Sequence, residues 1–163
     1  MGRFAGAFAG VLTVDPAVFG YDMESFDRPS VLDSAGAVPF SVVVDESFDW
    51  AGDRAPGHRW TDSVIYELHV KGMTALHDRV PEELRGTYAG LASPAVIDYL
   101  RDLGVTAVEL MPVHHFVSEP SVLTRGLTNY WGYNSIGFFA PHAGYDAWGD
   151  RGQQVAEFKS MVK

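Results

Sequence analysis

The chain has 163 residues, of which 47% are hydrophobic and 13% aromatic, enough apolar material for the core of one ordinary domain. Its formal net charge of -9 gives no basic surface for a phosphate backbone or an anionic membrane, so neither nucleic acid nor a membrane is expected as a partner. The lack of cysteine excludes disulfides, thiolate metal sites and a cysteine nucleophile, and it is compatible with a cytoplasmic location.

Proline and glycine interrupt the chain repeatedly between Val14 and about Arg59, which predicts an extended linker. Within this linker, only residues 40–44 have the apolar and β-branched character of a strand. Phe48 and Trp50 follow in an acidic setting, and we expect them to anchor the linker on a neighbouring domain. A contact between Trp50 and a ligand is the alternative.

Two strands are predicted in the second half of the chain. Residues 64–70 form a near-continuous apolar run that ends at Lys71 and Gly72, which is typical of a strand buried on both faces of a helix-covered parallel sheet. Residues 105–112 predict a second strand, and Pro112 ends it.

A helix is predicted between these strands, over residues 93–104. Ser93 suits the N-cap, Pro94 the first helical position and Gly104 the C-terminal stop. Its apolar stripe consists of Val96, Ile97, Leu100 and Leu103. Strand, helix and strand with a short connector predict a right-handed βαβ unit with parallel strands, and so an α/β fold.

Residues 113–149 lack a helix signal and are predicted to form one loop of 37 residues at the carboxyl end of the second strand. Ligands gather at this end of the strands in α/β folds. Residues 152–163 then show helical spacing. Because two strands and two helices can neither cover both faces of a sheet nor close a barrel, we expect the chain to be a piece of a longer protein.

The predicted loop contains an unusually aromatic stretch at residues 129–141, with five aromatic rings and two glycines. This spacing is neither helical nor strand-like, so it predicts an aromatic surface of the kind that stacks on sugar rings. We expect Trp131 and Tyr133, which flank a glycine, to contact a ligand. Phe138 and Phe139 are expected to anchor the loop instead.

Polar side chains interrupt both predicted strands. Glu67 and His69 alternate on one face of the first strand and Glu109 lies in the second, so they form either an acid/base pair or, as we favour, a satisfied polar layer inside the sheet. Adjacent residues of an extended chain point in opposite directions, so His114 and His115 are not expected to share a metal ion.

His115 is expected to shape a pocket wall, whereas the sequence does not place His142. The chain has no phosphate-binding glycine loop and no nucleophile elbow, so neither a nucleotide-dependent nor an acyl-transfer enzyme is indicated. Neither a cofactor nor a metal is expected.

Several runs of residues closely resemble the segment that leads into the catalytic barrel of bacterial glycogen debranching enzymes. These enzymes are isoamylase-type members of the α-amylase family, glycoside hydrolase family 13. The runs that carry the resemblance, which extends over roughly residues 14–163, are 42–45, 48–50, 53–54, 60–74, 103–114 and 129–134.

The resemblance implies an N-terminal β-sandwich, a (β/α)8 TIM barrel and a C-terminal β domain that together hydrolyse α-1,6 branch linkages with retention. On this basis, residues 1–60 are expected to be the extended linker that follows an absent sandwich. Residues 61–163 are expected to be the N-terminal quarter of the barrel, with its first two strand-helix units and the rest missing.

The resemblance also implies a site. Tyr133 matches the tyrosine that stacks on glucose at the cleavage subsite, and Trp131 matches a neighbouring pocket position. Tyr130 and His115 complete the expected contacts to the substrate. The expected substrate is an α-glucan such as glycogen, limit dextrin or a maltooligosaccharide. The family's catalytic carboxylates follow the position of Lys163, so no catalytic residue and no hydrolase activity are expected here. The alternatives are a glucan-binding module, a non-functional truncated product, or part of a trehalose-releasing hydrolase or branching enzyme.

Overall fold

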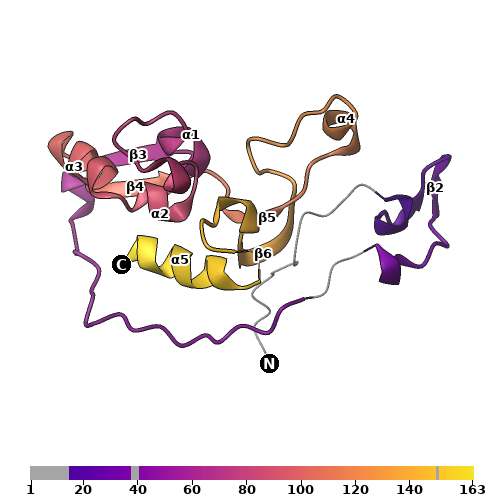
Figure 1. Cartoon of the computed structure of the whole chain (residues 1–163), viewed down its shortest axis with the longest axis horizontal. Helices are drawn as coiled ribbons and strands as arrows, with labels where there is room; N and C mark the ends of the chain where they lie inside the picture. Colours follow the sequence, from indigo (N-terminus) through magenta and orange to yellow (C-terminus); the bar gives the residue numbers. More distant parts are fainter. Residues whose placement is uncertain (1–14, 38–40, 150) are drawn as a thin grey trace.

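Two parallel strands and the helices that connect them lie together at one end of the molecule (Figure 1). The computed structural model describes residues 15–37, 41–149 and 151–163. Strand β3 (Ile65–Leu68) pairs with strand β4 (Ala107–Leu110) in parallel, and the register runs from Ile65 opposite Ala107 to Leu68 opposite Leu110. Helices α1 (Val70–Thr74), α2 (Tyr88–Leu91) and α3 (Pro94–Asp102) lie between them in the chain. The predicted parallel α/β arrangement is therefore confirmed.

Helix α3 follows the sequence signals closely. Pro94 occupies its first turn, and Gly104 adopts the left-handed backbone conformation, with φ 76°, that ends the helix. Ser93 stands at the N-cap as predicted. Val96 and Leu100 are buried, but the other two members of the predicted stripe, Ile97 and Leu103, are about half exposed. The apolar stripe is thus confirmed for only half of its members.

Strand β3 is shorter than the sequence predicted, because the chain turns into helix α1 directly after Leu68. His69 is the N-cap of that helix, and its Nδ1 accepts a hydrogen bond from the Gly72 N–H at 3.0 Å. The prediction that His69 shares a strand face with Glu67 is therefore wrong. Capping is the physical reason, since a side-chain acceptor at this position satisfies a free helical N–H.

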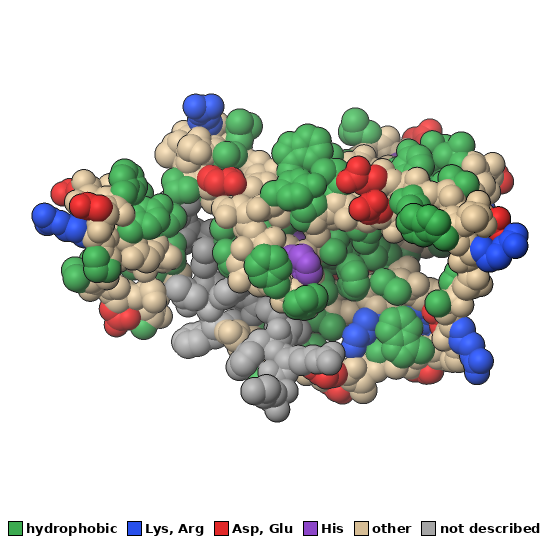
Figure 2. Space-filling view, turned by 180° about the vertical axis from the view of Figure 1, so that it is seen from behind, with side chains coloured by type: hydrophobic (Ala, Val, Ile, Leu, Met, Phe, Trp, Pro, Cys, Tyr) green, Lys and Arg blue, Asp and Glu red, His purple; other side chains and the backbone are tan. Residues whose placement is uncertain are grey.

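The expected burial on both faces of the strands is also wrong for the described residues. Val64, Ile65 and Val108 expose 49%, 49% and 43% of their surface. Figure 2 shows hydrophobic side chains exposed over much of one side of the molecule. The helices and loops of the described residues therefore leave part of the β3–β4 sheet exposed to solvent.

The segment after β4 is more regular than the single loop that was predicted. Strand β5 (His114–Phe116) pairs antiparallel with strand β6 (Ser135–Pro141), and helix α4 (Pro120–Leu123) lies at the tip of the connection between them (Figure 1). A 3-10 helix at Ala143–Tyr145 follows β6. An irregular register and a positive φ of 63° at Phe139 mark a bulge in β6. The bulge interrupts the alternation of inward and outward side chains by which a strand is recognised in a sequence.

The core lies where helix α5 (Gln153–Val162) packs beside α2. The Phe158 ring meets the fully buried Tyr88 ring edge-on, with 5.3 Å between their centroids. The buried hydrophobic residues that form this core are Leu68, Val70, Val80, Tyr88, Leu91, Val96, Leu100, Phe116 and Tyr145. The helix predicted at residues 152–163 is confirmed.

The N-terminal part holds a short antiparallel pair, β1 (Tyr21–Asp22) with β2 (Ser25–Pro29), and then a long extended segment. Of the strand expected at residues 40–44, residue 40 lies outside the described residues and residues 42–44 are not in a strand. Residues 1–14 of the expected linker also lie outside the description.

The extended segment is held against helix α5. Of the two expected aromatic anchors, Phe48 contacts the lysines of this helix, whereas Trp50 is 39% exposed and meets the Phe48 ring edge-on at 4.7 Å. Lys159 Nζ donates to the Glu46 carbonyl oxygen at 2.8 Å, and Lys163 Nζ donates to that of Asp49 at 3.0 Å. Both ammonium groups lie about 6 Å from the centre of the Phe48 ring, within range of a cation–π interaction. Phe48 therefore anchors this segment.

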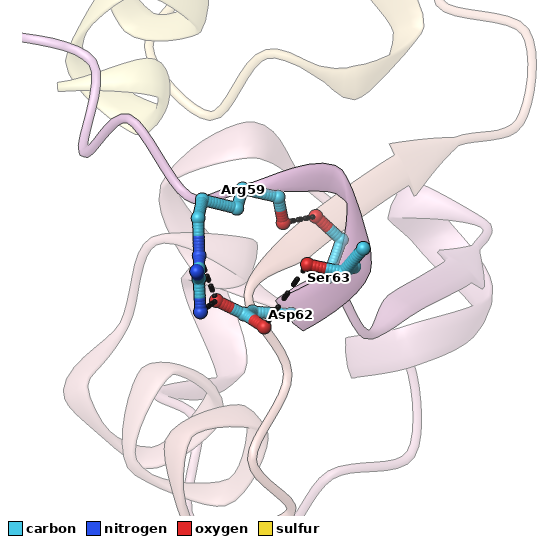
Figure 3. Close-up of polar contacts among 4 residues, drawn as sticks. Arg59, Asp62 and Ser63 are labelled. Carbon is cyan, nitrogen blue, oxygen red and sulfur yellow. Dashed lines mark hydrogen bonds and ion pairs between the residues drawn. The ribbon is translucent and has the colours of Figure 1, made fainter.

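A polar turn leads into β3 (Figure 3). Arg59 pairs with Asp62 at 2.7 Å across the 3-10 helix Trp60–Asp62, and the Ser63 hydroxyl donates to the Arg59 carbonyl oxygen at 3.0 Å. The pair is exposed, so it contributes little to stability. Within the described ranges, no helix combines the length and apolar character needed to cross a bilayer.

Candidate functional site

The loop at residues 129–133 is held in place by its own polar side chains. Asn129 donates from Nδ2 to both carboxylate oxygens of Glu119, at 3.0 and 3.1 Å, and its Oδ1 accepts from the Gly132 N–H at 2.9 Å. Gly132 has a φ of 79°, and a Cβ there would lie 3.0 Å from the Phe116 ring. Only glycine suits this position, and the loop can therefore pack tightly on β5.

His69 ties the same loop to the carboxyl end of β3. Its ring stacks on the Tyr130 ring at 4.1 Å with an interplanar angle of 4°. Since Nδ1 accepts from Gly72, the neutral ring carries its hydrogen on Nε2 and donates it to the Tyr130 carbonyl oxygen at 2.6 Å. The Tyr145 hydroxyl lies 3.1 Å from the same nitrogen. A single buried imidazole thus joins β3, α1 and the aromatic loop.

Two pockets open beside this loop. The first, which we call the strand-end pocket, has a volume of about 540 Å³ and lies just beyond the carboxyl ends of β3 and β4. The exposed Tyr133 ring is part of its wall. Its lining residues include Glu67, Glu109, Met111, Pro112, His114, Tyr133, Asn134 and Phe138.

Glu67 and Glu109 lie directly opposite each other in the register of β3 and β4, and both are exposed. The favoured prediction of a satisfied polar layer inside the sheet is therefore wrong in this structure. Exposure to water removes the desolvation cost that would have required partners. Both carboxylates lie on one wall of the strand-end pocket, where they can accept hydrogen bonds from a ligand.

The second pocket, which we call the histidine pocket, has a volume of about 340 Å³ and lies on the other side of β5. It is lined by His115, whereas His114 lines the strand-end pocket, so the prediction that these two side chains point apart is confirmed. The structure also places His142, which stacks on Phe116 at 3.7 Å and lies 5.2 Å from the His115 ring.

Burial holds three side chains of the histidine pocket neutral, those of His115, His142 and Tyr145. Burial, with a smaller contribution from the nearby His115, lowers the pKa of His142 to about 3, and burial also lowers the pKa of His115. Burial raises the pKa of Tyr145 to about 12, with a further contribution from Tyr130. At neutral pH, these side chains therefore offer hydrogen bonds without charge. No cluster of three or more His, Cys, Asp or Glu side chains suited to a metal ion occurs in the described ranges.

The structure separates the four residues that were expected to form one site. Tyr133 lines the strand-end pocket, whereas Tyr130 and His115 line the histidine pocket. Trp131 is 57% exposed and meets the Tyr130 ring edge-on at 5.2 Å. Sequence reasoning did not place His142, although it could have been found once β6 was paired with β5, because its N–H donates to the Val113 carbonyl oxygen at 2.8 Å.

The anchoring predicted for Phe138 and Phe139 is wrong. They expose 69% and 90% of their surface, and Phe138 contributes to the strand-end pocket. The bulge at Phe139 is the physical reason, because it turns both rings away from the core.

Known proteins similar to this chain share one metabolic setting. A Mycobacterium tuberculosis protein named glycogen operon protein GlgX homolog is 51% identical over 163 residues, which are 98% of this chain and 23% of the relative. The glycogen debranching enzyme of an Enterobacter species is 44% identical over 161 residues, covering 93% of this chain and 24% of that enzyme. The chain therefore spans about a quarter of the length of these relatives. No protein-family model matches it.

Solved structures agree in fold. A type I pullulanase from Bacillus subtilis, complexed with maltose, superimposes with a TM-score of 0.60 at 26% identity, over 78% of this chain and 19% of the pullulanase. A pullulanase from an Anoxybacillus species gives a TM-score of 0.51 at 29% identity, over 63% and 16%. Over nearly its whole length, the chain is therefore homologous to a segment of the bacterial glycogen debranching enzymes and GlgX homologs.

Proposed function

We propose that this chain is a segment of a debranching hydrolase that cuts α-1,6 linkages of glycogen or limit dextrin, and that it provides a glucan-stacking wall. The observation that carries the proposal is the position of Tyr133, whose ring is 70% exposed beside the carboxyl ends of two parallel strands. Substrates gather at this end of the strands in (β/α)8 barrels and other α/β folds.

The proposed architecture is the first part of a TIM barrel. In this proposal, residues 61–163 supply its first two strand-helix units, and residues 1–60 are a linker that follows a sandwich domain. The parallel pair β3 and β4 with its α3 crossover supports this assignment. The exposed side chains of Ile65 and Val108 support it too, since further strands and helices would cover them in a closed barrel.

Sugar binding is supported by the chemistry of the strand-end pocket. An aromatic face such as that of Tyr133 stacks on the apolar face of a glucose ring. Glu67, Glu109 and Asn134 line the same pocket and can bond to sugar hydroxyl groups. The similar Bacillus subtilis pullulanase was solved with maltose, which makes a neutral α-glucan the proposed ligand here.

We expect the chain by itself to hydrolyse no glucan. Retaining hydrolysis requires two carboxyl groups that flank the scissile bond. Glu67 and Glu109 are neighbours in register on one wall of the pocket, which does not place them on opposite sides of a bound linkage. Release of reducing ends from limit dextrin by the purified chain, measured over hours, would contradict this expectation.

Binding can be tested by following tryptophan fluorescence while maltoheptaose is added, because Trp131 lies two residues from Tyr133. The Tyr133→Ala chain should bind about 3- to 10-fold more weakly, since a stacked aromatic pair contributes roughly 0.5–1.5 kcal/mol beyond its buried area. Phe139→Ala is the control, because this ring is 90% exposed and outside the pocket wall. Absence of a saturable response, or equal affinities for all three chains, would refute the proposed stacking role.

A stand-alone glucan-binding module is the second candidate, and exposure of Trp131 together with Tyr133 favours it. Trehalose-releasing and branching enzymes remain the alternative specificities within the proposal. Comparing the affinities of a branched and a linear oligosaccharide distinguishes these specificities from debranching. If the pocket receives a branch point, an oligosaccharide with an α-1,6 branch should bind more tightly than linear maltoheptaose.

A further inference from the structure

The histidine pocket differs from the strand-end pocket in position and in chemistry. His114 and His115 are adjacent on β5, and their side chains enter the two pockets from opposite sides of the strand. The strand-end pocket contains two carboxylates, whereas the lining of the histidine pocket has none. Its one charged residue is Lys71, which lies exposed at the rim. The two pockets are therefore separate places where a ligand could bind.

The walls of the histidine pocket are built from paired rings. One pair is His69 stacked on Tyr130, and the other is His142 stacked on Phe116 at 3.7 Å and 15°. Tyr145 meets both histidines edge-on, at 5.6 and 4.8 Å, and joins the pairs. The volume of about 340 Å³ lies at the lower end of the roughly 300–1,000 Å³ typical of small-molecule sites. The pocket thus has rigid aromatic walls and the size for one or two sugar rings.

His142 adds a hydrogen-bond donor to the lining of this pocket. The Phe116 N–H lies 3.5 Å from His142 Nδ1, so Nδ1 is the acceptor and the neutral ring carries its hydrogen on Nε2. A Cβ at Gly144 would lie 2.6 Å from that Nε2. Gly144 does not have a positive φ, so its backbone does not require glycine. The missing side chain leaves space beside Nε2, as access for a ligand would require.

We propose that the histidine pocket is a second glucan site, which binds the terminal sugar rings of a neutral α-glucan on the side of β5 opposite Tyr133. This inference rests on the proposed function for its ligand class. Neutral imidazole and phenol groups can both donate to and accept from sugar hydroxyls, and the adjoining rings can pack on the apolar faces of the sugar. An anion is disfavoured, because burial keeps His115 and His142 uncharged.

Because His114 and His115 line different pockets, ligand binding to both pockets can be followed in one NMR titration. The chain has six histidines, and their ring signals can be assigned by NMR with single His→Gln variants. Maltotriose should produce saturable shifts of the His115 and His142 signals. The His114 signal reports the strand-end pocket in the same titration.

Two blocking variants test the site from different sides. Gly144→Ala places a methyl group against His142 Nε2, and Thr128→Trp adds a ring at an exposed position on the pocket rim. Each should weaken the maltotriose response of His115 and His142 about tenfold or more, while that of His114 remains. Leu127→Trp is the matched control for the second variant, because Leu127 is exposed and outside the pocket wall. If Gly144→Ala fails to fold, the comparison of Thr128→Trp with Leu127→Trp decides.

The outcomes separate this inference from the proposed function. Tyr133→Ala should weaken the maltotriose response of His114 about 3- to 10-fold and leave the His115 and His142 responses intact. If His115 and His142 do not shift at saturating maltotriose while His114 does, the second site is refuted and the strand-end pocket stands. If only His115 and His142 shift, the proposed role of Tyr133 fails instead. Shifts of His115 and His142 with inorganic phosphate but not with maltotriose would show an anion site and refute the proposal.

Discussion

Two groups of aromatic residues in the described part of the chain have opposite surroundings. Tyr88, Phe116 and Tyr145 are at most 7% exposed, whereas Tyr133 and Phe139 are 70% and 90% exposed. The buried tyrosines also satisfy their hydroxyl groups, as when Tyr88 donates to the His142 carbonyl oxygen at 3.1 Å. The exposed rings follow backbone irregularities, namely the positive φ of Gly132 and of Phe139. Backbone geometry, more than residue type, therefore decides which of these rings are buried and which are exposed.

The largest loss of stability is expected when a ring of the buried group is removed. Tyr88→Ala removes a ring with no exposed surface from between Tyr145 and Phe158, and we expect it to lower the free energy of unfolding by about 3–5 kcal/mol. Phe139→Ala, in the exposed group, should change it by less than about 0.5 kcal/mol. Denaturant unfolding followed by circular dichroism measures both. Similar losses for the two variants would contradict the division into two groups.

The next effect concerns Gly132, where the exposed loop touches the buried group. Gly132→Ala combines a left-handed backbone with a Cβ 3.0 Å from Phe116, whereas Gly126→Ala has a similar φ of 69° and open space around it. Gly126→Ala, the control, should lower the free energy of unfolding by about 1 kcal/mol through backbone strain alone. Gly132→Ala should lower it by about 2–3 kcal/mol. Gly132→Ala should also weaken maltoheptaose binding. Equal losses of stability in the two variants would show that contact with Phe116 does not matter.

A smaller effect, visible only as a pH dependence, is expected where α5 meets the core. Glu157 is buried, and its two oxygens accept from the N–H groups of Ala89 and Ala147, both at 2.8 Å. Burial, with a smaller contribution from the neighbouring Asp146 carboxyl group, raises the pKa of Glu157 from 4.5 to about 7. A raised folded-state pKa contributes stability that is fully present below pH 4.5 and is lost as the pH rises through about 7.

Asp146→Asn should weaken this pH dependence, because it removes the neighbouring negative charge and supplies an amide that can donate to Glu157. We expect the loss of stability between pH 5.5 and pH 8, measured by urea unfolding, to shrink by about 1 kcal/mol. Asp98→Asn, on the exposed side of helix α3, makes the same change in net charge and should leave the pH dependence as it is. An unchanged slope in the Asp146→Asn chain would refute the coupling.

The smallest effect is expected at the exposed turn of Figure 3. Arg59→Ala breaks the contact with Asp62, but both side chains are largely in water, at 81% and 49% exposed. Exposed ion pairs contribute about 0–1 kcal/mol, so the melting temperature should fall by no more than about 2–3 °C. A loss comparable to that of Gly132→Ala would mean that the turn helps to position β3.

The features that could be predicted from the sequence are those that depend on short stretches of the chain alone. Pro94 and Gly104 fix the ends of helix α3 through local backbone preferences, and the two flanking apolar runs pair as expected. The opposite directions of His114 and His115 follow from strand geometry alone.

What could not be predicted depends on contacts between distant residues. The pairing of β5 with β6 is hidden by the bulge at Phe139, whose N–H donates to His114 Nδ1 at 2.8 Å, 25 positions away. The end of β3 is set by the capping role of His69, which its apolar surroundings do not reveal. For the site, the exposure of Tyr133 agrees with the expected aromatic surface, but the division of Tyr130 and Tyr133 between two pockets requires the three-dimensional arrangement.

The bond between His69 and the Tyr130 carbonyl oxygen also bears on the order of folding. It joins residues 61 positions apart, and closing so long a loop carries an entropic cost that local contacts do not. Helix α1 needs only neighbouring residues to begin forming, so it can precede this bond. The aromatic loop would then be among the last parts to become ordered, and sugar binding to it would serve as a probe of complete folding.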